Sequence, residues 1–119
     1  MSDNFAFAFE RLKKAATGLP EVEESTWFGT PSLKVRKKSM CRVKDPDTVV
    51  LMCPIEEKEL LMAAAPDIYY ETDHYHGWPA VLIRIRAISD EELAHRLALA
   101  WKMQAPKKLA AAQQPANEP

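Results

Sequence analysis

Apolar and basic side chains alternate along the chain between residues 33 and 44. A period of two places successive side chains on opposite faces of a β-strand, so the pattern predicts an antiparallel hairpin with one apolar and one basic face. A short polar turn, Lys37-Lys38-Ser39, separates the two runs. The alternation predicts that four cations share the basic face: Lys34, Arg36, Arg42 and Lys44.

In the rest of the chain, segments with this period of two are followed by segments in which apolar residues recur with the helical period. Helices are expected at residues 3–17, 54–65 and 89–105, and strands at 22–28, 48–53, 68–71 and 80–86, in addition to the hairpin. Ser89 and Glu92 have capping-box spacing at the start of the last helix. The order α-β-β-β-β-α-β-β-α predicts an α+β fold. We expect an antiparallel sheet of about six strands, in two hairpin-containing units, with three helices packed on it.

With 119 residues the chain has room for one domain, which we place at residues 1–106. Residues 107–119 are rich in Ala, Gln and Pro and are expected to form a partly disordered tail. Cys41 and Cys53 have no CxxC spacing and are interpreted as buried small apolar residues. Without a signal peptide or a long apolar stretch, the chain is expected to be a cytoplasmic monomer that does not contact membranes.

Three stretches together resemble the MmcQ/YjbR-like family over residues 5–110. They are residues 18–38, with Gly18-Leu19-Pro20 and Gly29-Thr30-Pro31; residues 74–85, with Gly77-Trp78-Pro79; and Trp101 with Ala105-Pro106-Lys107-Lys108. The resemblance implies a double-wing, or CyaY-like, fold of two β-hairpins with packed helices. It also implies a suggested role in DNA binding. Met40 stands where the family pattern leads us to expect an aromatic residue.

The net charge of −1 excludes a basic field over the whole protein, so contact with nucleic acid requires local clustering. Six basic residues fall between positions 34 and 44, and Arg84 and Arg86 add charge on the second hairpin. These cations favour phosphate contacts along DNA. The alternative is a solvated strand face that Glu21, Glu23, Glu24 and Asp47 neutralise. The candidate DNA-binding residues are Lys34, Arg36, Lys37, Lys38, Arg42, Lys44, Arg84 and Arg86.

A second hypothesis is a non-catalytic domain that binds a protein or a small ligand. Its surface would combine the aromatic turn at Trp27 and Thr30 with the loop at His74 and Trp78. The alternative is that Trp27 belongs to the core and that His74 and Trp78 close the loop over the sheet.

We expect no cofactor, metal or catalytic residue. His74 and His76 could share a metal, but no further His or Cys cluster completes a site. The serines lack a nucleophile elbow, and the three glycines provide no phosphate loop.

Overall fold

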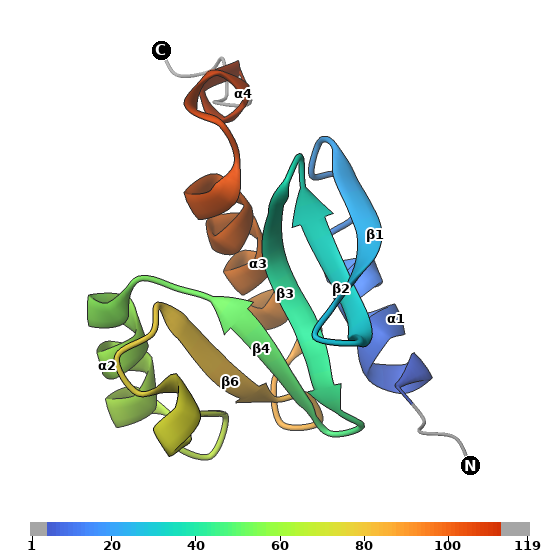
Figure 1. Cartoon of the computed structure of the whole chain (residues 1–119). Helices are drawn as coiled ribbons and strands as arrows, with labels where there is room; N and C mark the ends of the chain where they lie inside the picture. Colours follow the sequence, from blue (N-terminus) through green and yellow to red (C-terminus); the bar gives the residue numbers. More distant parts are fainter. Residues whose placement is uncertain (1–4, 113–119) are drawn as a thin grey trace.

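The alternating segments form the strands of one continuous antiparallel sheet, in the order β1-β2-β3-β4-β6-β5 (Figure 1). The computed structural model describes residues 5–112. The strands are β1 (Val22–Trp27), β2 (Thr30–Val35), β3 (Lys38–Asp45), β4 (Thr48–Met52), β5 (Tyr69–Tyr70) and β6 (Ala80–Arg84). The predicted α+β fold and the six-stranded antiparallel sheet are therefore confirmed.

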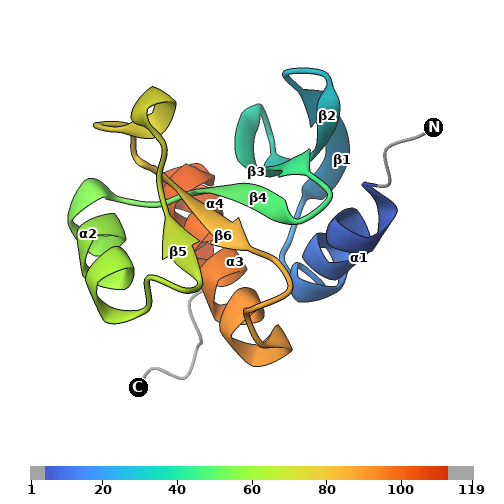
Figure 2. The same ribbon diagram turned by 90° about the horizontal axis from the view of Figure 1, so that it is seen from below.

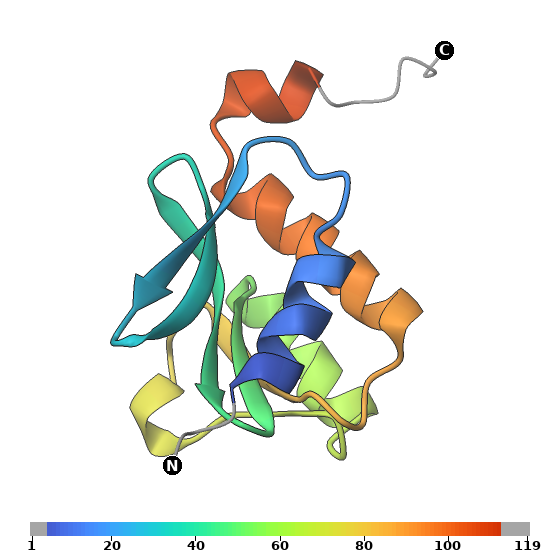
Figure 3. The ribbon, with the colours of Figure 1, turned by 90° about the vertical axis from the view of Figure 1, so that its right-hand side faces the viewer.

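Two of the predicted helices, α1 (Ala6–Ala15) and α3 (Asp90–Gln104), cover one face of the sheet (Figure 3). The third, α2 (Ile55–Ala64), lies at the β5 end of the sheet, and α1 lies at the opposite end (Figure 2). The structure adds α4 (Lys107–Ala112) within the predicted tail, where Leu109 packs against the core. Residues 113–119, the rest of that tail, lie outside the described residues. None of the helices within residues 5–112 combines the length and apolar character needed to cross a membrane.

The main core fills the space between the sheet and the helices. The apolar period-two side chains of the strands meet the apolar stripe of α3, and the expected face of β6 is buried there. The Ser89 half of the predicted capping box forms, because the Ser89 hydroxyl accepts a hydrogen bond from the backbone N–H of Glu92. The Glu92 carboxylate accepts from the Tyr69 hydroxyl instead. Both cysteines and Met40 are buried in this core. Met40, where the resemblance leads us to expect an aromatic residue, is therefore a core side chain.

The opposite face of the sheet, which we call the open face, is only partly covered. The loop of residues 71–79, with the short 3-10 helix η1 (Asp73–Tyr75), lies over β4 and β6. Tyr75 fills a small second core with Val50, Ala80 and Leu82. Between this loop and the β1–β2 hairpin the open face carries polar side chains and a hollow.

A bulge changes the predicted geometry of the basic hairpin. Leu33 pairs with Cys41, but the next residue, Lys34, pairs with Ser39, so Met40 is the extra residue in β3. Met40 and Cys41 are both buried as a result. The turn consists of Arg36 and Lys37 and not of residues 37–39, which corrects the sequence interpretation. Strict alternation fails because a bulge shifts the pleat by one residue.

Candidate functional site

The predicted basic face does not form one free surface. Arg36 has a φ of 57° in the turn and forms a two-pronged ion pair with Glu21, next to the start of β1. Lys34 lies 4.0 Å from Glu23, its cross-strand neighbour, and Lys44 lies 3.9 Å from Asp45. Much of the charge of these cations is thus balanced within the molecule.

Arg42 serves as an internal link on the open face. Its Nη1 donates to the Thr30 hydroxyl at 3.1 Å, and its Nη2 donates to the Tyr75 hydroxyl at 2.9 Å. Its guanidinium also lies over the ring of Phe28, 5.1 Å from the centroid. Arg42 therefore joins the β1–β2 turn to the loop over the sheet, and these contacts would have to break before it could contact a phosphate.

The two arginines of the second hairpin are also engaged. Arg84 donates to the carbonyl of Pro66 at 3.1 Å and lies over the Tyr70 ring. Arg86 bonds Asp47 at 2.8 Å and lies over the Phe7 ring. These are long side chains on apolar and aromatic surfaces, with their charge directed to a protein partner.

Lys37 and Lys38, at the tip of the hairpin, differ from the other six. Both are exposed, and within residues 5–112 no carboxylate lies within ion-pair distance of either ammonium. The pairing seen elsewhere therefore leaves the tip as the most available positive charge among the predicted cations.

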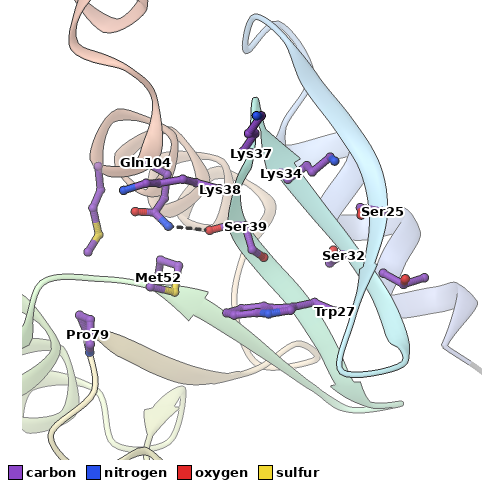
Figure 4. A pocket seen from close by; sticks show the side chains of 12 residues that line it. Ser25, Trp27, Ser32, Lys34, Lys37, Lys38, Ser39, Met52, Pro79 and Gln104 are labelled. Atoms are coloured by element: carbon purple, nitrogen blue, oxygen red, sulfur yellow. Dashed lines mark hydrogen bonds between the residues drawn. The ribbon is translucent and has the colours of Figure 1, made fainter.

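These two lysines border a hollow of about 610 Å³ on the open face (Figure 4), which we call the first hollow. Three serines, Ser25, Ser32 and Ser39, come from the neighbouring strands β1, β2 and β3. The hollow's charged residues are all lysines, and within the described chain no Asp or Glu lines it. The complete lining is Ser25, Thr26, Trp27, Ser32, Lys34, Lys37, Lys38, Ser39, Met52, Pro79, Met103 and Gln104.

Trp27 forms one wall of the first hollow and is half-buried (Figure 4). It ends β1 before a two-residue turn in which Phe28 and Gly29 have φ values of 56° and 78°, and the Thr30 hydroxyl donates back to the carbonyl of Trp27. Two positive φ values are the mark of a type I′ hairpin turn. The aromatic pair is thus a surface feature more than a core feature, because Phe28 is 64% exposed.

The end of α3 forms another wall of the first hollow. Gln104 donates from its Nε2 to the carbonyl of Ser39 at 2.8 Å, which fixes the end of α3 beside the bulge in β3 (Figure 4). The hydroxyl of Ser39 itself is buried, with no hydrogen-bond partner among residues 5–112. The end of α3 and the hairpin tip thus enclose the positive side of the hollow.

The loop of residues 71–79 is held by a lysine that the sequence did not single out. Lys58 of α2 is 1% exposed, and its Nζ donates to the carbonyls of Tyr75 at 2.8 Å and Trp78 at 3.0 Å. The same ammonium lies 2.6 Å from Glu71. An ammonium has three N–H donors, and all three are used, so we interpret Lys58 as structural. It positions Pro79, which lines the first hollow.

Of the loop residues predicted to face a ligand, His74 and Trp78 are exposed and lie 5.9 Å apart by ring centroids. Tyr75, between them in sequence, is the one that packs on the sheet. His76 points to Glu71, with its Nδ1 2.9 Å from the carboxylate. Among residues 5–112 no three His, Cys, Asp or Glu side chains are grouped as a metal site would need.

Comparison with known proteins agrees with this fold. The sequence model of the YjbR family matches residues 17–103. Uncharacterized proteins of Mycobacterium tuberculosis and Mycobacterium bovis are each 44% identical over 52 residues, which is 44% of this chain and 40% of theirs. The matched segment thus spans less than half the length of these relatives.

A crystal structure of a Deinococcus radiodurans protein with a DUF419 domain superposes with a TM-score of 0.66. The superposition covers 80% of this chain and 76% of that one, at 21% sequence identity. That likeness concerns the fold. The match of the family's sequence model over most of the chain, together with the two-hairpin sheet and its packed helices, shows that this protein belongs to the YjbR family.

Proposed function

We propose that this protein is a non-catalytic DNA-binding protein and that the first hollow, with the hairpin tip, is its contact surface. The observation that carries the proposal is the lining of the hollow, which combines three lysines, three serines and an indole and, within residues 5–112, no carboxylate. Lysines and hydroxyls bind phosphate oxygens, and an indole face stacks on a base.

This proposed contact surface differs from the basic hairpin faces expected from the sequence. Lys34, Lys37 and Lys38 remain in it, and Trp27 joins them from the second hypothesis. Arg42, Arg84 and Arg86 have internal partners, so they contribute less to binding in this proposal. Their removal would cost folding energy more than affinity.

The arrangement supports binding more than chemistry. A nucleophilic serine needs a base within hydrogen-bond distance. Among residues 5–112 no hydrogen bond joins Ser25, Ser32 or Ser39 to a lysine or a histidine. The proposal therefore assigns Ser25, which is half-buried, to hydrogen bonding with a bound ligand, because the Ser39 hydroxyl is buried and Ser32 is 1% exposed.

The test is DNA binding by fluorescence anisotropy at about 50 mM and about 200 mM salt. Each lost phosphate contact should reduce the salt slope by about one, so Lys37→Ala with Lys38→Ala should reduce it by about two. Lys14→Ala is the matched control, because Lys14 is an exposed lysine on α1, on the other face of the sheet. An isotherm unchanged in the double variant would remove the site, and no binding at the lower salt would remove the function.

A second candidate is a small anionic ligand held in the first hollow alone. Its volume of about 610 Å³ favours this reading, because ligand sites usually have about 300–1,000 Å³. A shift in melting temperature with a mononucleotide, and no affinity for an oligonucleotide, would favour the small ligand.

A further inference from the structure

A second hollow lies on the other side of the hairpin tip. It has a volume of about 660 Å³ and lies between the tip and the link from α3 to α4. Like the first hollow, it has cations and, among the described residues, no carboxylate in its lining. That lining is Arg36, Lys37, Lys38, Met103, Gln104, Ala105 and Pro106.

The two hollows are adjacent. They share Lys37 and Lys38 from the hairpin tip and Met103 and Gln104 from the end of α3. Lys38 is drawn close to Gln104 at this junction (Figure 4). Together they form a path from Trp27, across this shared border, to Pro106, which we call the groove.

Positive charge recurs along this groove. Lys34, 4.0 Å from Glu23, lies in the first hollow, and Arg36, ion-paired with Glu21, lies in the second. Lys37 and Lys38, without a carboxylate partner among residues 5–112, lie at the junction. Beyond Pro106, α4 begins with the exposed pair Lys107 and Lys108. A ligand with one phosphate would contact one of these cations, whereas a chain with repeating phosphates would contact several of them.

The groove is long enough for several nucleotides. Trp27 pairs with Thr30 and Lys38 pairs with Val35, so the first hollow alone extends along the six residues of β2, which are five residue steps. At about 3.3 Å per residue this is roughly 17 Å. A nucleic-acid strand rises about 3.4 Å per nucleotide in a helical conformation, so this length holds about five nucleotides, and fewer when the strand is extended.

The same groove suits an unpaired strand better than a duplex. Trp27 is half-buried in the wall, and its ring can stack only on a base that is itself unstacked.

Resting on the proposed function, we infer that the ligand is single-stranded DNA of several nucleotides. The strand runs from Trp27 over Lys38 into the second hollow beside Pro106. One base stacks on Trp27, and successive phosphates meet Lys34 and the two tip lysines. At Arg36 a phosphate replaces the Glu21 carboxylate as the partner of the guanidinium.

The experiment measures the affinity for oligothymidylates of two, four and eight nucleotides, for thymidine monophosphate, and for a duplex. The affinity should rise with length, and the eight-nucleotide strand should bind at least about tenfold more tightly than the duplex, in line with the stabilisation from one stacked base.

Arg36→Asn separates the two hollows, because asparagine tolerates a positive φ and removes the charge that only the second hollow has. It should weaken the eight-nucleotide strand about threefold to tenfold and leave the dinucleotide unchanged, since the lost contact is one partly exposed charge. Trp27→Leu should weaken both strands, and Lys14→Ala should weaken neither. Lys38→Glu, at an exposed position, provides a second variant if Trp27→Leu does not fold.

Three results would overturn the inference. An affinity independent of length would confine the ligand to the first hollow, and duplex binding as tight as single-strand binding would exclude an unpaired strand. Equal effects of Arg36→Asn on short and long strands would remove the second hollow. In each case, DNA binding that still depends on Lys37 and Lys38 would support the proposed function. If no nucleic acid bound at all, both the proposed function and this inference would be wrong.

Discussion

The Lys58 ammonium lies 2.6 Å from the Glu71 carboxylate, beneath the loop that covers part of the open face. Lys58 also donates to two carbonyls of that loop, so one side chain of α2 holds the segment from residue 71 to residue 79. We expect Lys58→Met to destabilise the protein by roughly 3 kcal/mol, because it leaves a carboxylate and two carbonyls without their donor. Urea denaturation measures this. Lys14→Met, on an exposed surface, should change the free energy of unfolding by less than about 0.5 kcal/mol.

The Glu71 carboxylate should also contribute to the loss of stability at acid pH. Hydrogen bonds from His76 and then Lys58 lower its pKa in the folded state below the ordinary value of 4.5. A lowered folded-state pKa gives stabilisation that is complete above the unfolded-state pKa and is lost as the pH falls through the folded-state pKa. We therefore expect a loss of stability below about pH 4.5 that is smaller in Glu71→Gln. Denaturant midpoints between neutral pH and pH 3 test this, and identical pH profiles of the two proteins would contradict it.

We expect Arg42 to contribute to the stability of the fold and Lys38 to contribute to DNA binding. Arg42→Met removes three hydrogen bonds and a cation–π contact, and we expect a loss of about 2 kcal/mol in the free energy of unfolding. The salt dependence of DNA binding should stay as in the wild type. Lys38→Ala should do the reverse, with normal stability and a salt slope reduced by about one. A reduced slope in Arg42→Met would show that Arg42 leaves its internal partners to contact phosphate.

The Phe28-Gly29 turn provides a test of backbone conformation alone. Gly29 has a φ of 78°, and a Cβ added there would meet no atom within 4 Å. Gly29→Ala should therefore destabilise the protein by about 1 kcal/mol through the left-handed conformation and not through a clash. Gly29→Asn should cost less, because asparagine adopts that conformation more readily. Equal losses in the two variants, measured by chemical denaturation, would argue against this origin.

The two cysteines should be unreactive in the folded protein. Burial raises the pKa of the Cys41 thiol to about 12 and that of Cys53 to about 11. The thiolate is the reactive form, so a disulfide reagent at neutral pH should label neither cysteine until the chain unfolds. Labelling in urea provides the control that both thiols are present. Fast labelling of one thiol in native buffer would place that cysteine at an accessible site.

The sequence was sufficient for much of the fold and for only part of the candidate site. Period-two alternation and the Ser89 cap predicted strands and a helix correctly, because both signals depend on neighbours in the chain. The bulge at Met40 was missed, since an extra residue shows only in the pairing of two strands. Leu109 gave no helical period by itself, although the core stabilises α4 through it.

The partners of the cations were harder to predict from the sequence than the strands and helices. The sequence hypothesis named Glu21, Glu23, Glu24 and Asp47 as neutralising residues. Three of them pair with Arg36, Lys34 and Arg86, whereas Glu24 pairs with Lys13 of α1, outside the predicted basic face. It could not foresee that Arg42 would bond Tyr75, 33 positions later, or that Gln104 would close the hollow. Such contacts depend on tertiary distance, which local pattern does not contain.

The anchoring of the covering loop by Lys58 has a consequence for kinetics. Because the wall at Pro79 is held before any ligand arrives, the groove needs no slow rearrangement ahead of encounter. Complex formation should then follow one exponential whose observed rate rises linearly with DNA concentration and falls steeply with added salt.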